Sequence, residues 1–266
     1  MMKKIIITAL FICLSISIFS QSTSYFKAVY TTYYNTDVPQ IRTALLHIDI
    51  KNKRSIFHLG KNKNIDKSSS KITTNDYGAS YTIKYKDIES FIELNLNNGS
   101  IYSKENHRGK TYYVKDKVSN LNWNLNYSEN KKIGTLLCKK ATTHFRGRNY
   151  TAWYTTEIPI NYGPYKFQGL PGLIASINDD SNTFIWILSS YKATKEKPSF
   201  VDKNKLKPQI NAKEYYRKIR YPSDDEKLNR IQSKLPKGIK LISATSDTNI
   251  RKGIETKFEW EKDKKE

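Results

Sequence analysis

Short stretches in which apolar or β-branched residues alternate with polar ones follow one another along most of the chain. This pattern, interrupted by turn residues, is typical of β-strands. It predicts strands over residues 25–35, 41–50, 55–59, 81–85, 90–96, 101–103, 111–114, 122–125, 136–146, 149–158, 173–177 and 183–191. A polar stretch over residues 60–80 predicts a long exposed loop. We therefore expect a mainly β fold, either a curved antiparallel sheet or a half-barrel-like meander.

The pattern changes after residue 192, where two helix starts are present. Asn211 is followed three residues later by Glu214, and Ser223 is followed in the same way by Glu226. Both pairs match a capping box, in which the two residues cap a helix reciprocally. They predict two short C-terminal helices, over residues 212–220 and 224–235. The expected class is therefore β-rich α+β.

The first twenty residues have the layout of a secretory signal peptide. Lys3 and Lys4 precede an uncharged stretch over residues 5–19. This stretch is shorter than the length of about 20 apolar residues that a helix needs to span a bilayer. We expect cleavage after Ser20, with an uncleaved N-terminal anchor as the alternative. The residues before Cys13 are too bulky for a lipoprotein signal, so no lipid tether is expected. The protein is predicted to be exported, and not to be transmembrane after cleavage.

Beyond residues 1–20, the sequence divides near residue 191. Residues 21–191 carry the strand pattern and are expected to form an antiparallel β domain. Residues 192–266 are expected to form a basic helical appendage, in which an apolar pattern over residues 254–260 indicates a strand that returns to the sheet. Between residues 192 and 240, 15 Lys and Arg stand against 6 Asp and Glu, an excess of +9.

The chain of 266 residues has 46 Lys and Arg against 25 Asp and Glu, a net charge of +21. In a cytosolic protein this charge would first suggest nucleic acid. Predicted export argues against nucleic acid, and leaves an envelope protein or an anionic envelope surface or glycolipid as the expected partner. Abundant Lys, Asn, Ile and Tyr also suit a chain encoded by AT-rich DNA, so the charge alone identifies no ligand.

The common catalytic signatures are missing from the sequence: there is no nucleophile elbow, zinc-protease motif, Cys-x-x-Cys pair or glycine-rich phosphate loop. The four histidines, His47, His58, His107 and His144, are scattered, so we expect no metal site and no cofactor. Once the leader is removed, Cys138 is the single thiol. A free thiol in an exported protein is either buried or available for pairing between chains, and the apolar neighbours of Cys138 favour burial.

Residues 123–174 are the stretch richest in Trp, Gly and Pro. Pro171-Gly172 suits the centre of a type II turn, which requires a positive φ at the glycine. The neighbouring Leu and Ile side chains are expected to pack around that turn. The residues expected to shape this corner are Trp123, Cys138, Trp153, Pro164, Gly169, Leu170, Pro171, Gly172, Leu173 and Ile174.

Six elements of this stretch occur in a fixed order. They are Trp123, Cys138 with Ala141, the block Phe-Arg-Gly-Arg-Asn-Tyr-Thr-Ala-Trp at 145–153, Ile158-Pro159, Gly163-Pro164 with Phe167, and Gly-Leu-Pro-Gly-Leu-Ile at 169–174. The stretch thereby resembles the GLPGLI family of Bacteroidetes envelope proteins. The resemblance implies an exported protein of the periplasm or the outer membrane. It implies no activity, because the family has no established biochemical function.

Cationic and aromatic side chains are interleaved in the same stretch. Arg can bind phosphate or carboxylate through two hydrogen bonds, and Tyr can stack on sugars or acyl chains. The candidate binding residues are Arg146, Arg148, Tyr150, Tyr162, Tyr165 and Lys166. We therefore favour a non-enzymatic binding or accessory module for an envelope partner or an amphiphilic ligand.

Two other functions are compatible with the sequence. An envelope hydrolase with an unrecognised acid–base site would draw on Glu157, Asp179, Asp180 and His144. A pocket converging on His144, with a carboxylate within hydrogen-bond reach, would favour this function. A purely structural role in an outer-membrane complex would instead require a large exposed apolar patch.

Overall fold

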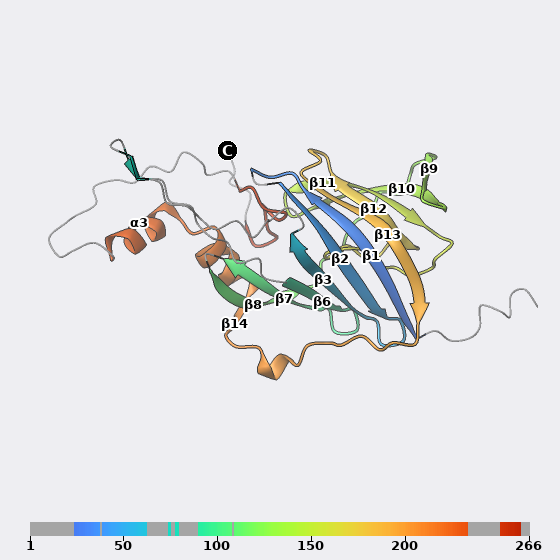
Figure 1. Ribbon diagram of the computed structural model, residues 1–266, viewed down its shortest axis with the longest axis horizontal. Helices are drawn as coiled ribbons and strands as arrows, with labels where there is room; N and C mark the ends of the chain where they lie inside the picture. The colour runs from blue at the N-terminus through green and yellow to red at the C-terminus, as the bar shows by residue number, and fades with distance from the viewer. Residues whose placement is uncertain are drawn as a thin grey trace, which may run out of the picture.

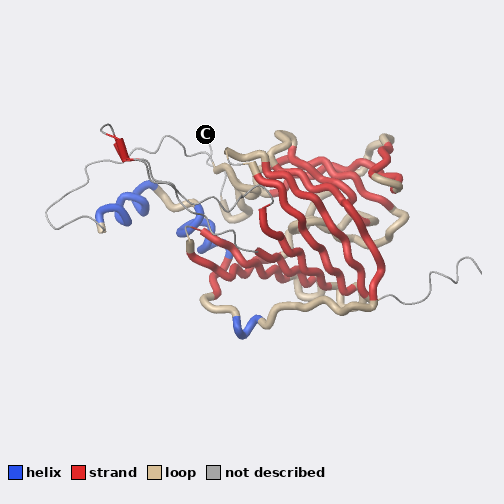
Figure 2. Tube along the Cα trace, viewed as in Figure 1, coloured by secondary structure: helices blue, strands red, loops and turns tan. Residues whose placement is uncertain are grey.

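The computed structural model describes residues 24–37, 39–62, 74–75, 78–79, 90–107, 109–233 and 251–261 (Figures 1 and 2). The predicted signal peptide and the predicted strand over residues 81–85 lie outside these residues. The strands are β1 (Tyr25–Tyr34), β2 (Gln40–Asp49), β3 (Arg54–Asn62), β4 (Thr74–Asn75), β5 (Gly78–Ala79), β6 (Ser90–Asn95), β7 (Ser100–His107), β8 (Lys110–Lys117), β9 (Asn130–Ile133), β10 (Leu136–Phe145), β11 (Arg148–Thr155), β12 (Leu173–Asp179), β13 (Phe184–Thr194) and β14 (Gln209–Asn211).

Twelve of the strands form one sheet, in the order β14-β8-β7-β6-β3-β2-β1-β13-β12-β11-β10-β9. Every pair is antiparallel except β14 and β8, which are parallel. Pairing of β1 with β13 joins an N-terminal arm, from β1 to β8, to a C-terminal arm, from β9 to β13. The sheet is open, since β14 and β9 stand at its two ends. The prediction of a mainly β fold is confirmed.

The hydrophobic core lies between the two arms and is closed by the chain that connects β11 to β12. One continuous cluster includes Leu94 and Ile101 from the N-terminal arm and Ala152 and Phe145 from the C-terminal arm. Phe167, from the connection, is fully buried among them. The Tyr30 hydroxyl of β1 donates a hydrogen bond to the Ile174 carbonyl at 2.7 Å, which ties the start of β12, directly after the connection, to the centre of the sheet.

Most predicted strands are present, because their alternating pattern matches the alternating burial of a one-sided sheet. In β1 every second residue is buried along most of the strand. The two short strands predicted over residues 101–103 and 111–114 extend further, as β7 and β8. Residues 122–125 form no strand, and only a single bridge joins Asn124 to Thr142.

The capping box of Ser223 and Glu226 is complete, and Asn211 caps its helix without the reciprocal bond from Glu214. The Asn211 side chain accepts from the Glu214 amide at 2.8 Å, and Ser223 and Glu226 bond each other's amide groups. The first helix is α2 (Ala212–Glu214) continued by the π-helix η3 (Tyr215–Arg220), and the second is α3 (Asp224–Gln232). A single 3-10 turn, η2 (Lys203–Lys205), precedes them. A second hydrophobic cluster packs α2 and η3 against β8 through Val114, Ala212, Tyr215, Tyr216 and Phe258.

Residues 251–261 contact the turn between β10 and β11, but as irregular chain rather than as the strand expected from their apolar pattern. The Arg146 carbonyl accepts from the amides of both Thr256 and Lys257, at 2.8 and 3.1 Å. In a β-sheet, successive hydrogen bonds join different residues of the two strands, whereas here two successive amides bond the same carbonyl. This segment therefore does not pair as a strand. We call residues 251–261 the C-terminal strap.

The turn at Pro171-Gly172 differs from the sequence prediction. Gly172 does not have a positive φ, whereas Gly169 does, at +94°. A Cβ atom on Gly172 would lie 1.9 Å from the Thr155 carbonyl oxygen. Glycine is required at residue 172 because two backbones approach closely, not because the turn is of type II. Among the described residues, none of the helices has the length and apolar character of a membrane span.

Candidate functional site

Arg146 occupies the turn between β10 and β11 with a positive φ of 44°, and its side chain is 3% exposed. Its guanidinium reaches from the C-terminal arm to β8 on the N-terminal arm. There Nη1 donates to Oδ2 of Asp116 at 2.7 Å and Nη2 donates to Oδ1 at 3.1 Å. This is the bidentate geometry for which arginine is suited. Strands close to the two ends of the open sheet are therefore linked by a buried ion pair.

Lys166 and Glu255 complete a cluster of four charges. Lys166 Nζ lies 3.0 Å from Asp116 Oδ2 and 2.6 Å from Glu255 Oε1, and Arg146 Nη1 lies 2.6 Å from Glu255 Oε2. The Tyr165 hydroxyl also donates to Glu255. Two cations and two carboxylates balance, so the group is neutral as a whole. We call Asp116, Arg146, Lys166 and Glu255 the Arg146 cluster.

Burial and charge act in opposite directions on the pKa values of the Arg146 cluster. Burial alone would raise the pKa of both carboxyl groups, but the adjacent Lys166 and Arg146 outweigh it and hold the pKa of Asp116 and of Glu255 below the usual range. Burial would lower the pKa of Arg146 and Lys166, but the two carboxylates raise both. The four groups are therefore charged together, each stabilised by the others.

The remaining candidate binding residues also contact the chain itself. Arg148 donates to the Gly253 carbonyl at 3.0 Å and to Asp179 at 2.9 Å, and the Tyr150 hydroxyl donates to the Ile254 carbonyl at 3.2 Å. Tyr162 is buried and its hydroxyl has no hydrogen-bond partner among the described residues.

Five of the six candidates are thus buried: Arg146, Tyr150, Tyr162, Tyr165 and Lys166. Most of the candidates hold the C-terminal strap, and the pattern of alternating cations and aromatics did not indicate this. The partners Asp116 and Glu255 were missed in the sequence, because they lie 30 and 109 residues from Arg146. Nothing local distinguishes them from other acidic residues.

The predicted corner residues surround the connection between β11 and β12. Trp123 Nε1 donates to the Gln168 carbonyl at 2.9 Å, and the Phe167 amide donates to the Pro164 carbonyl at 3.1 Å. Leu170, Leu173 and Ile174 are buried, whereas Gly169 and Pro171 are exposed.

Cys138 and Trp153 lie in a small separate cluster with Leu136 and Ala175. Cys138 is fully buried, as its apolar neighbours predicted, and burial raises the pKa of its thiol to about 11. The thiol is therefore protonated at neutral pH, which argues against a role as nucleophile.

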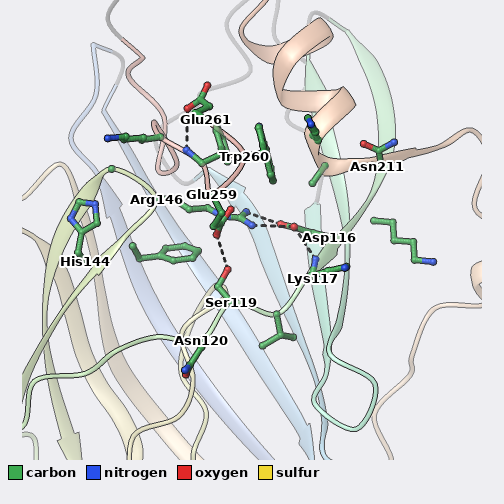
Figure 3. A pocket seen from close by; sticks show the side chains of 18 residues that line it. Asp116, Lys117, Ser119, Asn120, His144, Arg146, Asn211, Glu259, Trp260 and Glu261 are labelled. Carbon is green, nitrogen blue, oxygen red and sulfur yellow. Dashed lines mark hydrogen bonds and ion pairs between the residues drawn. The ribbon is translucent and has the colours of Figure 1, made fainter. Parts of the chain in front are cut away.

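A cavity of about 1030 Å³ opens beside the Arg146 cluster, between β8, the turn after β10, the start of α2 and the C-terminal strap (Figure 3). Phe145, Phe258 and Trp260 give it an aromatic wall, and Phe258 and Trp260 stack at 4.8 Å between ring centroids. We call it the Trp260 cavity. Its volume is in the upper range for small-molecule sites.

The acidic residues that line the Trp260 cavity are paired within the protein, whereas most of its lysines are not paired with any described residue. Its acidic residues all have internal partners: Asp116 binds Arg146, Glu259 binds Arg146 and Ser119, and Glu261 binds Arg251. The lysines lining the cavity are Lys115, Lys117, Lys213 and Lys257, all exposed. Within the described part of the chain, the first three of these have no ion pair. The cavity therefore presents uncompensated positive charge beside aromatic surface.

The acid–base candidates do not converge. His144 lines the Trp260 cavity, but its Nδ1 lies 2.8 Å from Asn149 Oδ1, and no carboxylate of the described residues bonds to its ring. Asp179 is buried, where it accepts from Arg148, Ser181 and the Phe184 amide. Glu157 accepts from the Leu137 amide at 3.0 Å, at the opposite end of β10. Asp180 is exposed in the turn after β12.

Across the described ranges, no three His, Cys, Asp or Glu side chains gather as metal ligands.

Residues 146–176 match the sequence pattern of a family described as "Protein of unknown function (Porph_ging)". No curated protein matches the sequence. Among solved structures, two crystal forms of PNGF-II are similar, with TM-scores of 0.44 and 0.43 at 15% identity, over 72% of this chain and 32% of theirs. This chain thus spans about a third of the length of PNGF-II.

An uncharacterized conserved protein from Thermus thermophilus is also similar, with a TM-score of 0.39 at 5% identity, over 71% of this chain and 91% of the other. No activity follows from similarities of this size. The GLPGLI family name stays a prediction. Over the turn that carries Arg146 and the connection that carries Lys166, the chain is similar to a family of unknown function.

Proposed function

We propose that this protein is a non-enzymatic binding module of the cell envelope, and that the Trp260 cavity takes up an anionic amphiphile such as an acidic lipid or glycolipid. The observation that carries the proposal is the combination of uncompensated lysines with an aromatic wall. An acidic headgroup would pair with the lysines, while an apolar chain would lie against Phe145, Phe258 and Trp260.

The Arg146 cluster supports this proposal by fixing the walls of the cavity. Asp116 holds β8, Arg146 holds the turn after β10, and Glu255 and Glu259 hold the C-terminal strap. All three walls are therefore joined through one guanidinium. In this proposal Arg146 positions the walls, and the exposed lysines contact the ligand.

Location in the envelope is the second part of the proposal and depends on residues 1–20, which lie outside the described residues. Their charged and then apolar layout supports export. N-terminal sequencing of the protein recovered from a periplasmic extract should begin at Gln21. A protein that retains Met1 in the cytosolic fraction would contradict export.

Three amphiphiles with the same chain but different headgroups test the ligand class. We expect dodecanoate, below its critical micelle concentration, to bind at least about tenfold more tightly than dodecyl maltoside or dodecyltrimethylammonium, as measured by isothermal titration calorimetry. Replacing Lys117→Glu together with Lys213→Glu should weaken dodecanoate binding at least about tenfold, because the headgroup loses two cations.

A matched control variant reverses the charge of two exposed lysines that lie outside the cavity. Lys132→Glu with Lys139→Glu changes the net charge equally, but Lys132 and Lys139 do not line the cavity. Dodecanoate binding by this variant should equal that of the unchanged protein. Equal binding of the three headgroups, or equal loss in both double variants, would contradict the proposal.

A further inference from the structure

A second cavity, of about 610 Å³, lies on the other side of the Arg146 cluster. The two cavities divide the cluster between them, because Asp116 and Arg146 line the first, whereas Glu255 and its partner Tyr165 line the second. Its walls come from β1, β2, β3, β6, β7, β13, η3, the connection between β11 and β12, and the C-terminal strap. Its rings include Tyr34, Phe57, Phe91, Tyr215, Tyr216 and Tyr221. We call it the tyrosine cavity.

The charged groups of the tyrosine cavity are balanced. Asp37 pairs with Lys252 at 2.7 Å, and Glu255 pairs with Lys166 and Arg146. Lys104, Glu105 and Arg220 also line the cavity, so that its lining residues are three cations and three carboxylates. Ionic ligands of either sign would therefore meet charge of their own sign.

Several polar groups of the tyrosine cavity can still bond a ligand. Tyr215 and Tyr216 are 2% and 8% exposed, and neither hydroxyl has a hydrogen bond among the described residues. Glu105 forms no ion pair in the described part of the chain, and burial raises its pKa despite the nearby Lys166. Tyrosine hydroxyls donate and accept, and a carboxyl group accepts when ionised.

We propose that the tyrosine cavity binds an uncharged polyhydroxylated ligand, a short oligosaccharide. Aromatic faces pack against the apolar C–H surface of a sugar ring, and its hydroxyls both donate and accept. The tyrosine hydroxyls, Lys104, Glu105 and Arg220 offer both kinds of partner around those faces. The volume is within the range of small-molecule sites. This site is separate from the Trp260 cavity and does not depend on the function proposed for it.

Calorimetric titration with three neutral trisaccharides, maltotriose, triacetylchitotriose and mannotriose, tests the proposal, with choline as a cationic probe. We expect saturable binding of at least one trisaccharide and at least tenfold weaker binding of choline. Glu105→Gln removes the charge at constant shape, and Phe91→Ala removes a half-buried ring. Each should weaken trisaccharide binding at least fivefold.

Thermal melts of both variants verify folding, and Glu105→Gln remains informative if Phe91→Ala does not fold. The double variant with Lys117→Glu and Lys213→Glu changes the Trp260 cavity and should bind the trisaccharide normally. No binding of any trisaccharide at 10 mM overturns the proposal. Preferred binding of choline, or binding that Glu105→Gln leaves unchanged, overturns it as well.

Discussion

Single residues in the connection between β11 and β12 are constrained by backbone contact more than by turn type. The sequence indicated correctly that a glycine is needed beside Pro171, but the reason lies in the packing of Thr155 against residue 172. A turn motif is visible locally, whereas the approach of a strand 17 residues earlier is not. The sequence therefore predicted a glycine at residue 172, but not the backbone contact with Thr155 that requires it.

Gly172→Ala is expected to destabilise the protein by about 3 kcal/mol or more, because its Cβ would overlap the Thr155 carbonyl and force two strands apart. The measurement is urea unfolding at neutral pH. Gly99→Ala is the comparison, since Gly99 has a positive φ of 62° but open space around it, and should lose only about 1 kcal/mol. If the two variants unfold at the same urea concentration, backbone contact at Gly172 is not the constraint.

Elements that depend on neighbours in sequence were predictable, and those that depend on distant partners were not. Alternation located β1, and the capping pairs Asn211-Glu214 and Ser223-Glu226 located both helix starts, because each signal is complete within a few residues. The C-terminal strap shows only an apolar pattern, which is shared by strands and irregular chain. Its position is determined by Glu255, whose two cationic partners come from other parts of the chain.

Acid should release the C-terminal strap and destabilise the protein. Asp116 and Glu255 have folded-state pKa values below their ordinary ones, so they stabilise the fold above the unfolded pKa values of about 4. That stabilisation is lost as the pH falls through the folded values. We expect the free energy of unfolding to decrease steadily below about pH 4.5, measured by urea unfolding from pH 7 to pH 2.5.

The double variant Asp116→Asn with Glu255→Gln provides the control for acid sensitivity. It should be less stable at pH 7, because Arg146 and Lys166 remain buried without compensating charge, a loss of about 3–5 kcal/mol. Its stability should depend less on pH below 4.5, since two titrating groups are gone. A slope equal to that of the unchanged protein would show that other carboxyl groups cause the acid sensitivity.

At the scale of the whole molecule, the net charge can be read from the sequence. Which cations are buried and which are exposed depends on the fold. The excess of basic residues was evident from composition. The fold removes Arg146 and Lys166 from the surface by pairing them internally, and leaves Lys117 and Lys213 exposed beside an aromatic wall. Composition alone could not separate these two groups of cations.

The net charge, +21 for the whole sequence and +19 once Lys3 and Lys4 are removed with the leader, predicts that the protein associates with anionic membranes through long-range attraction. Cosedimentation with vesicles containing phosphatidylglycerol should be strong at 20 mM salt and fall at least about tenfold at 0.5 M, because the screening length shortens from roughly 20 Å to about 4 Å. Vesicles of phosphatidylcholine alone should bind little at either salt concentration. Binding of dodecanoate in the Trp260 cavity should weaken less over the same range, since the ligand and the lysines are in contact. Salt-independent vesicle binding would instead indicate apolar insertion, and would assign membrane attachment to exposed aromatic residues such as Tyr191.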